Sequence, residues 1–211
     1  MKRMIGINAT RTTRFLTGVA MFAGALLAFP SCQQLTPMGG RTVDVITTGD
    51  LEAVGPIDIA VAPVVDLTEG VQGGEIPDRI LRTAFQRALL KRRYSPLSIG
   101  YVDSFVVDGA YAHGSAAEDA VLVLSIERWN DTLWEIHHAL EITMEVRVVD
   151  PTAPAGSDLW KGRVERRFDK SDFPGHDGLS TDVQRFENAC NSIASEILAA
   201  MPARTSAPGR L

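Results

Sequence analysis

Two sets of side chains in this sequence have the residue types for metal binding. His137 and His138 are adjacent, and Asp66, Glu69 and Glu75 lie in a glycine-rich loop. We place the two histidines in a strand, where successive side chains point to opposite faces and cannot share one ion. The acidic loop lacks the ligand spacing of an EF-hand, so a solvated loop is favoured over a calcium site. The sequence therefore predicts no metal and no cofactor.

The motifs that mark nucleophilic or nucleotide chemistry are absent from the sequence. It contains no GxSxG nucleophile elbow, no GxxxxGK[ST] phosphate loop and no GxGxxG after a strand. We therefore expect a protein that is not an enzyme. A hydrolase with an unrecognised site stays open as a minor alternative.

The N-terminal segment has the pattern of an export signal that ends at a cysteine. Its first fourteen residues contain four basic side chains and no acidic one, and residues 15–29 are uncharged and apolar. This stretch is shorter than the ~20 residues of a membrane-spanning helix. Residues 28–32 resemble a bacterial lipobox, although Phe29 and Pro30 stand where leucine and a small residue are usual. We predict that residues 1–31 are a signal peptide and that Cys32 is acylated, with a palmitate-type chain.

The remaining cysteine and the charge exclude several classes of protein. With Cys32 acylated, Cys190 is a lone thiol, which excludes an internal disulfide and a cysteine-based metal site. Removal of residues 1–31 removes four basic and no acidic residues, so the formal charge changes from −5 to −9. An acidic chain of this kind is not expected to bind nucleic acid.

Composition divides the mature chain into three parts. Residues 32–56 are polar and rich in glycine and proline, which indicates a lipidated N-terminus and a flexible tether with a reach of roughly 25–30 Å. Within them, Val43 to Thr47 is a candidate for a short edge strand. Residues 57–201 are predicted to form a single globular α/β domain, and residues 202–211 a disordered tail.

The first half of the domain predicts a strand followed by a helix. Residues 57–65 are rich in β-branched side chains until Pro63 interrupts the ladder. Pro77 then suits the first turn of a helix, whose apolar stripe is Ile80, Leu81, Ala84, Phe85, Ala88 and Leu89. We place Arg79, Arg82, Gln86 and Arg87 on the opposite, solvent-facing side. Residues 94–107 are predicted to hold a second, shorter strand.

The second half predicts an antiparallel meander and a closing helix. Residues 119–129 are predicted to form a central strand. Residues 138–148 alternate apolar and polar side chains, which predicts a long strand with one buried face. Residues 159–168 are predicted to return antiparallel to it, with Trp160, Val164 and Phe168 on one face. Residues 181–201 carry a helical stripe of Val183, Phe186, Cys190, Ile193, Ile197 and Met201. The predicted fold class is α/β (an α+β sandwich), with a mixed sheet of about five strands packed by two main helices.

Short segments of this domain resemble a known group of proteins. They are residues 59–63 in the first strand, residues 92–97 after the first helix, residues 119–122 opening the central strand, and residues 148–150 with 159–160 in the meander. Behind a lipobox, this order resembles a family of uncharacterised Gram-negative envelope lipoproteins. More distantly it resembles the amino-terminal domain of TolB, the periplasmic domain of the curli secretion lipoprotein and the lipoprotein activators of peptidoglycan synthases. The resemblance implies a binding or assembly role in the envelope.

The candidate interface residues are Trp129, Trp134, Asp66 and Glu69. The tryptophans flank a predicted turn, where aromatics serve as core or as interface anchors, whereas Trp160 is assigned to the core. The leading hypothesis is a non-enzymatic envelope lipoprotein that binds another envelope protein, or itself, within a secretion, transport or assembly machine. The alternative is a periplasmic binder of a small molecule, lipid or cell-wall fragment. Gln33, which replaces the aspartate of inner-membrane retention, favours the outer membrane facing the periplasm.

Overall fold

Three long antiparallel strands form the centre of the sheet in the computed structural model, which describes residues 43–45, 49–68, 75–153, 157–169, 172 and 181–205. The seven-stranded sheet has the order β1-β9-β8-β7-β2-β4, and β3 also pairs with β7. The strands are β1 (Val43–Val45), β2 (Asp58–Val61), β3 (Val65–Asp66), β4 (Ser95–Pro96), β7 (Ala120–Asn130), β8 (Leu140–Val149) and β9 (Asp158–Phe168). Because β2 runs parallel to β4 and β7 while β8 and β9 are antiparallel, the sheet is mixed, as predicted.

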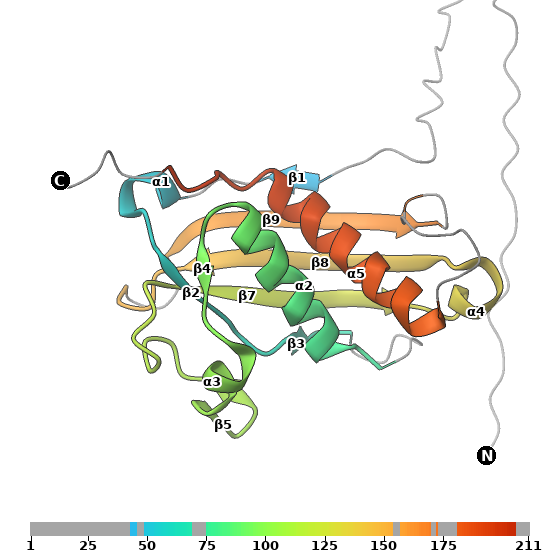
Figure 1. Ribbon diagram of the computed structural model, residues 1–211, viewed down its shortest axis with the longest axis horizontal. Coiled ribbons are helices and arrows are strands. Elements are labelled where there is room, and N and C mark those ends of the chain that lie inside the picture. Colours follow the sequence, from blue (N-terminus) through green and yellow to red (C-terminus); the bar gives the residue numbers. More distant parts are fainter. Residues whose placement is uncertain are drawn as a thin grey trace, which may run out of the picture. The chain divides into compact units, whose positions relative to one another are not determined.

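Two helices lie side by side across one face of this sheet, as Figure 1 shows. They are α2 (Asp78–Lys91) and α5 (Asp182–Ala199). Three shorter helices, α1 (Leu51–Val54), α3 (Ile99–Asp103) and α4 (Trp134–His137), and the hairpin β5 (Val106–Val107)–β6 (Ala110–Tyr111) complete the described elements. The α/β fold class with a meander and two main helices is therefore confirmed.

The main core lies between the meander and the two long helices. Strand residues alternate as predicted, so Leu140, Met144 and Val146 point into this core together with Trp160 and Phe168. Each large side chain buried in this way contributes ~1.5–3 kcal/mol. The Trp160 ring lies over Gly162 so closely that a Cβ there would be 2.6 Å from Cη2 of the indole. A glycine at this position is what admits the ring.

The second face of the sheet is divided into an apolar part and a charged part. Near β2 and the start of β7, Ala60, Val121 and Val123 pack with Val102 and Tyr111, from α3 and the β5–β6 hairpin. Over β8 and β9 the same face carries ion pairs, among them Lys161 with Glu145 (2.6 Å), Arg147 with Asp158 (3.3 Å) and Arg163 with Glu127 (2.7 Å). The meander therefore buries one face and leaves most of the other to water.

The ordered fold extends beyond residues 57–201 at both ends. Within the predicted tether 32–56, β1 pairs antiparallel with β9, as the edge-strand prediction anticipated, and Leu51 of α1 is buried in the core. At the other end, Pro202 accepts a hydrogen bond from the Tyr94 hydroxyl (2.9 Å), and the backbone N–H of Arg204 donates to the Arg92 carbonyl (2.9 Å). These contacts order residues 202–205, which the sequence placed in a disordered tail.

Residues 94–107 hold a second, shorter strand as predicted, the two-residue β4, which ends before the Ser98 side chain caps α3 at the backbone N–H of Tyr101. One local prediction needs correction. Val183, assigned to the buried stripe of the last helix, is 65% exposed because it lies in the first turn of α5, before the helix meets the core. In the part of the chain that the structure describes, we find no helix with the length and apolarity to cross a bilayer.

Cys190 provides a chemical test of this core. Its side chain is fully buried, and burial, with a smaller effect of the Glu187 carboxylate, raises the pKa of the thiol to about 12. We expect the native Cys32→Ala variant to react with a thiol-specific disulfide reagent at pH 8 at least a thousandfold more slowly than the urea-unfolded chain, because thiolate and access are both lacking. Rapid labelling without denaturant would show that α5 does not pack as described.

Candidate interaction surface

An aromatic cluster joins α4 to the first turns of α5. The Phe186 ring packs edge-on against Trp134 (centroids 5.1 Å apart) and against Trp129 (6.0 Å). Edge-to-face pairs of this kind are favourable beyond the area that they bury. The cluster therefore fixes α4, a single helical turn, against the start of the long helix.

Two large apolar side chains are exposed on the two helices that this cluster joins. Ile136 of α4 is 74% exposed and Val183 of α5 is 65% exposed. Val183 precedes Phe186 by three residues, so the two share one side of α5. The capping box between Thr181 and Gln184 fixes the beginning of this helix and hence the position of Val183. We call Trp134, Ile136, Val183 and Phe186 the α4 corner.

The structure separates the two tryptophans that were predicted as interface residues. Trp129 is only 1% exposed and belongs to the core, so it has no surface for a docked partner, which corrects that assignment. Trp134 is partly buried and packs against the core from the α4 corner. Trp160 is fully buried, as predicted.

The other predicted site residues do not join the α4 corner. Asp66 lies on β3, opposite Ile126, where its carboxylate accepts hydrogen bonds from the backbone N–H (2.9 Å) and hydroxyl (2.7 Å) of Thr68. These bonds lower the pKa of Asp66, so it is a charged turn residue. Glu69 and Cys32 lie outside the described residues.

The histidine pair is not on a strand, contrary to prediction. His137 ends α4, and His138 follows in the left-handed conformation (φ 49°), because the chain turns there before entering β8. Among the described residues, no three histidine, cysteine, aspartate or glutamate side chains are grouped as metal ligands.

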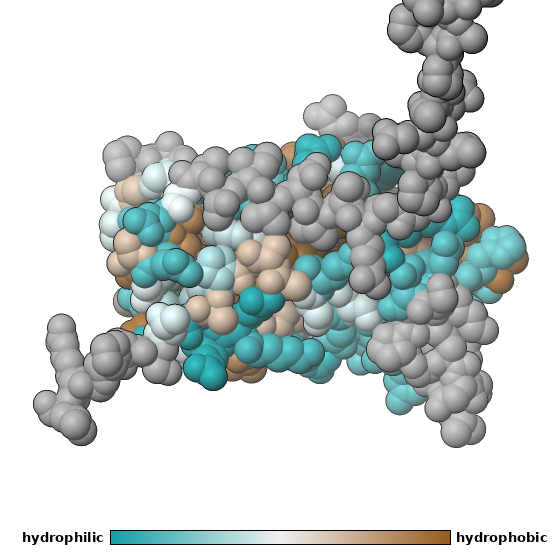
Figure 2. Space-filling view, turned by 90° about the horizontal axis from the view of Figure 1, so that it is seen from above, coloured by the Kyte–Doolittle hydropathy of each residue, from teal (hydrophilic) through white to brown (hydrophobic). Residues whose placement is uncertain are grey.

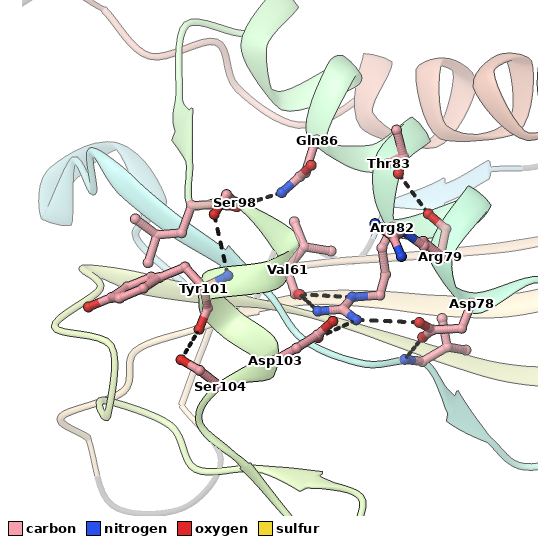
Figure 3. Close-up of polar contacts among 12 residues, drawn as sticks. Val61, Asp78, Arg79, Arg82, Thr83, Gln86, Ser98, Tyr101, Asp103 and Ser104 are labelled. Atoms are coloured by element: carbon pink, nitrogen blue, oxygen red, sulfur yellow. Dashed lines mark hydrogen bonds and ion pairs between the residues drawn. The ribbon is translucent and has the colours of Figure 1, made fainter.

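A buried arginine, which sequence reasoning placed in solvent, ties three elements together near the end of β2. Arg82 of α2 is 2% exposed, and its guanidinium donates to the carbonyl of Val61 through Nε (3.2 Å) and Nη2 (3.0 Å), as Figure 3 shows. Its Nη1 contacts Asp78 at 3.3 Å and Asp103 at 2.7 Å. Asp78 in turn accepts from the backbone N–H of Val64 (2.7 Å). The guanidinium thus holds β2, α2 and α3 in place.

The helical spacing of the sequence does not reveal this role. Arg82 directly follows the buried Leu81 and lies at the margin of the apolar stripe, where an arginine is usually exposed. Its partners come from the strand before α2 and the short helix after it, and α3 was not predicted. With its donors used within the fold, Arg82 positions structure and has no free donor set for a substrate.

Polar residues predominate on one face of the described domain. In Figure 2, seen from above the view of Figure 1, hydrophilic residues surround small hydrophobic areas on the described part of that face. A hollow lined by Val54, Ile57, Glu118, Asp119 and Asp150 is open and acidic, and its carboxylates already accept internal hydrogen bonds. It has none of the enclosure expected of a small-molecule site.

Comparison with known proteins adds fold-level similarity at low identity. No protein-family model matches the chain, and neither does any curated protein. Among solved structures, a PelC dodecamer variant from Paraburkholderia phytofirmans shares 14% identity over 78% of this chain and 100% of that one, with a TM-score of 0.48. A lipoprotein from Neisseria meningitidis shares 18% identity over 66% of this chain and 99% of that one (TM-score 0.43). A DUF4136 family protein from Bacteroides thetaiotaomicron shares 9% identity over 76% and 94% of the two chains (TM-score 0.37).

These similarities are too weak to carry a function over to this chain. Two of the similar structures are described as a lipoprotein and a putative lipoprotein, from Neisseria meningitidis and Caulobacter crescentus. A fold like that of the TolB domain or the curli lipoprotein stays a prediction.

The arginine network makes a stability prediction. We expect Arg82→Ala to lower the free energy of unfolding by about 2–3 kcal/mol in urea titrations, because it leaves the Val61 carbonyl unpaired and detaches α3. The value is at the low end for a buried pair because Asp78 and Asp103 are nearly half exposed. Arg79→Ala, three residues earlier on the exposed side, should change stability by less than about 0.5 kcal/mol. Equal effects of the two substitutions would contradict the network.

Proposed function

We propose that this chain is a non-enzymatic, lipid-anchored envelope protein whose domain binds another envelope protein through the α4 corner. The observation that carries the proposal is the exposure of Ile136 and Val183 on α4 and α5, the two helices that the packed rings of Trp134 and Phe186 join. Exposed aliphatic side chains on a rigid aromatic support are typical of the anchors that dominate protein interfaces.

Further support comes from the sequence before the domain. A basic and apolar leader, residues 1–31, precedes Cys32, and β1 begins at Val43, so that residues 33–42 link the proposed anchor to the fold. Acylation of Cys32 would hold the domain at a membrane surface, for which we propose the periplasmic face of the outer membrane. A role in a secretion, transport or envelope-assembly machine follows from this combination of anchor and binding surface.

The alternative of a small-molecule, lipid or cell-wall binder has less support. It requires an enclosed apolar pocket, whereas the core between the meander and the helices is filled by large side chains such as Trp129, Phe85 and Phe168. The surface hollow beside Glu118 and Asp119 is open and polar. No convergent set of catalytic groups supports an enzyme in the described part of the chain.

Site-specific photocrosslinking tests the interface. A photoreactive phenylalanine analogue placed at Ile136 should give one protein adduct in intact cells. At Val107, which is 66% exposed on the β5–β6 hairpin, it should give none. The two positions match in exposure and residue type, so the difference reports location. Adducts of equal yield at both positions, or none at Ile136, would overturn the interface.

The proposed anchor is tested separately. We expect the wild-type protein to sediment with membranes and to incorporate labelled palmitate, and the Cys32→Ala variant to do neither, because the acylated thiol is lost. The Cys190→Ala variant is the matched control, because its thiol is buried in the core. Palmitate labelling of the Cys32→Ala variant would refute the assignment of the anchor.

A further inference from the structure

Arginine and lysine side chains are distributed unevenly over this domain. On the three meander strands every basic side chain pairs with a carboxylate: Arg128, Arg147, Lys161, Arg163, Arg166 and Arg167. On the outer side of α2, by contrast, Arg79, Arg87 and Lys91 are exposed and form no ion pair with any described residue. Among the described residues, unpaired positive charge is thus concentrated on α2 and the exposed Arg93 that follows it.

These three cations follow a single ridge of α2. Arg79, Thr83, Arg87 and Lys91 are spaced by four residues, the spacing of one helical ridge, and extend over about 18 Å. Leu90, which is exposed, lies next to Lys91. We call Arg79, Arg87 and Lys91 the basic ridge. Its convex shape and flexible side chains suit a flat anionic surface.

A shallow groove beside the ridge has room for a polar headgroup. It has a volume of about 220 Å³ and is lined by Arg79, Thr83 and Arg87 of α2, by Ile80, and by Glu187 and Asn191 of α5. The Arg87 guanidinium contacts the Asn191 side-chain oxygen at 3.4 Å, which orients it along the groove. The planar guanidinium of arginine can donate two parallel hydrogen bonds to phosphate oxygens, so the groove fits phosphate esters between its two guanidiniums.

We propose that the basic ridge docks the domain on the anionic phospholipid surface of the membrane to which Cys32 is anchored. This inference rests on the proposed lipid anchor and adds an orientation, with α2 facing the bilayer. The formal charge of −9 for the mature chain does not prevent docking, because acidic groups on the far face lie beyond the screening length of ~8 Å at physiological salt.

Because the domain is proposed to be anchored, weak electrostatic binding is sufficient to orient it on the membrane. Each cation near an anionic bilayer strengthens binding by about fivefold, so the three together contribute roughly a hundredfold. At physiological salt that is too little for stable binding by a free protein, whereas low salt strengthens it. A short connection to the membrane, however, holds the domain at an effective concentration in the mM range, where this contribution decides the orientation.

Amine acetylation of the anchored protein tests the orientation. The mature chain from Cys32 onward is coupled through that thiol to a maleimide lipid in vesicles, while the buried Cys190 stays unmodified. On vesicles of phosphatidylglycerol and phosphatidylcholine, Lys91 should be acetylated at least fivefold more slowly than on phosphatidylcholine alone. Lys161, paired with Glu145 on the sheet, is the internal control and should react equally on both. Equal acetylation of Lys91 on the two membranes would overturn the proposal.

Substitutions identify the ridge as the cause. Sedimentation of the uncoupled mature chain with phosphatidylglycerol vesicles at low salt should weaken roughly a hundredfold in the triple variant Arg79→Gln, Arg87→Gln, Lys91→Gln. Removal of the acid in the groove by Glu187→Gln should strengthen it several-fold, and Arg163→Gln on the sheet should leave it unchanged. Unaltered binding of the triple variant, or the same loss in Arg163→Gln, would refute the ridge.

The alternative ligand of the basic ridge is an acidic protein, and crosslinking distinguishes it from phospholipid. A photoreactive side chain at Thr83 should crosslink to phospholipid in intact cells, and a single protein adduct there would overturn membrane docking. These measurements are independent of the protein partner at the α4 corner. Vesicle binding can therefore fail while the crosslink at Ile136 succeeds, and the reverse.

Discussion

The constraint on which this structure depends is that three long antiparallel strands must bury one face. On β7, β8 and β9 most apolar side chains point to the side of α2 and α5, where they form the core with Trp129, Trp160 and Phe168. The opposite side of the same strands carries the small cluster of Val121, Val123 and Val149 at one end and, over the rest, charges that neutralise one another between strands. Since a strand cannot change this alternation without a bulge, the two faces have fixed and different characters. Recognition is therefore left to strand ends and to the outer sides of helices.

The helices reach their positions through polar contacts as well as apolar ones. Arg82 anchors the first half of α2 to the end of β2, and Arg92 at the other end of the helix donates to the carbonyls of Ala199, the last residue of α5, and of Met201. The two arginines are thereby used within the fold. The basic residues between and beside them face outward, and their charge is available to a partner. One arginine-rich helix consequently serves both stability and binding.

Periodicity in the sequence was enough to predict the main elements. Alternation over residues 138–148 identified β8, and the stripe from Ile80 to Leu89 identified the buried side of α2. What it could not predict depends on contacts between distant segments. The burial of Arg82 requires Val61 and Asp103, and α4 depends on the packing of Trp134 against the distant Phe186. The sequence prediction assigned too many residues to the tether and to the tail. Segments rich in glycine and proline can still pair with the edge of a sheet, as β1 does with β9, or bond to the fold, as Pro202 does with Tyr94.

The two proposed binding surfaces lie on different parts of the domain and use different physics. The α4 corner presents apolar side chains on a rigid support, which favours a complementary protein pocket and a slow dissociation. The basic ridge presents flexible charges on a convex helix, which favours a flat, anionic and exchangeable surface. If both act, docking through the ridge fixes which way the α4 corner faces. The anchored domain then meets its partner in one orientation, so that the membrane contact strengthens protein binding without adding any contact to that interface.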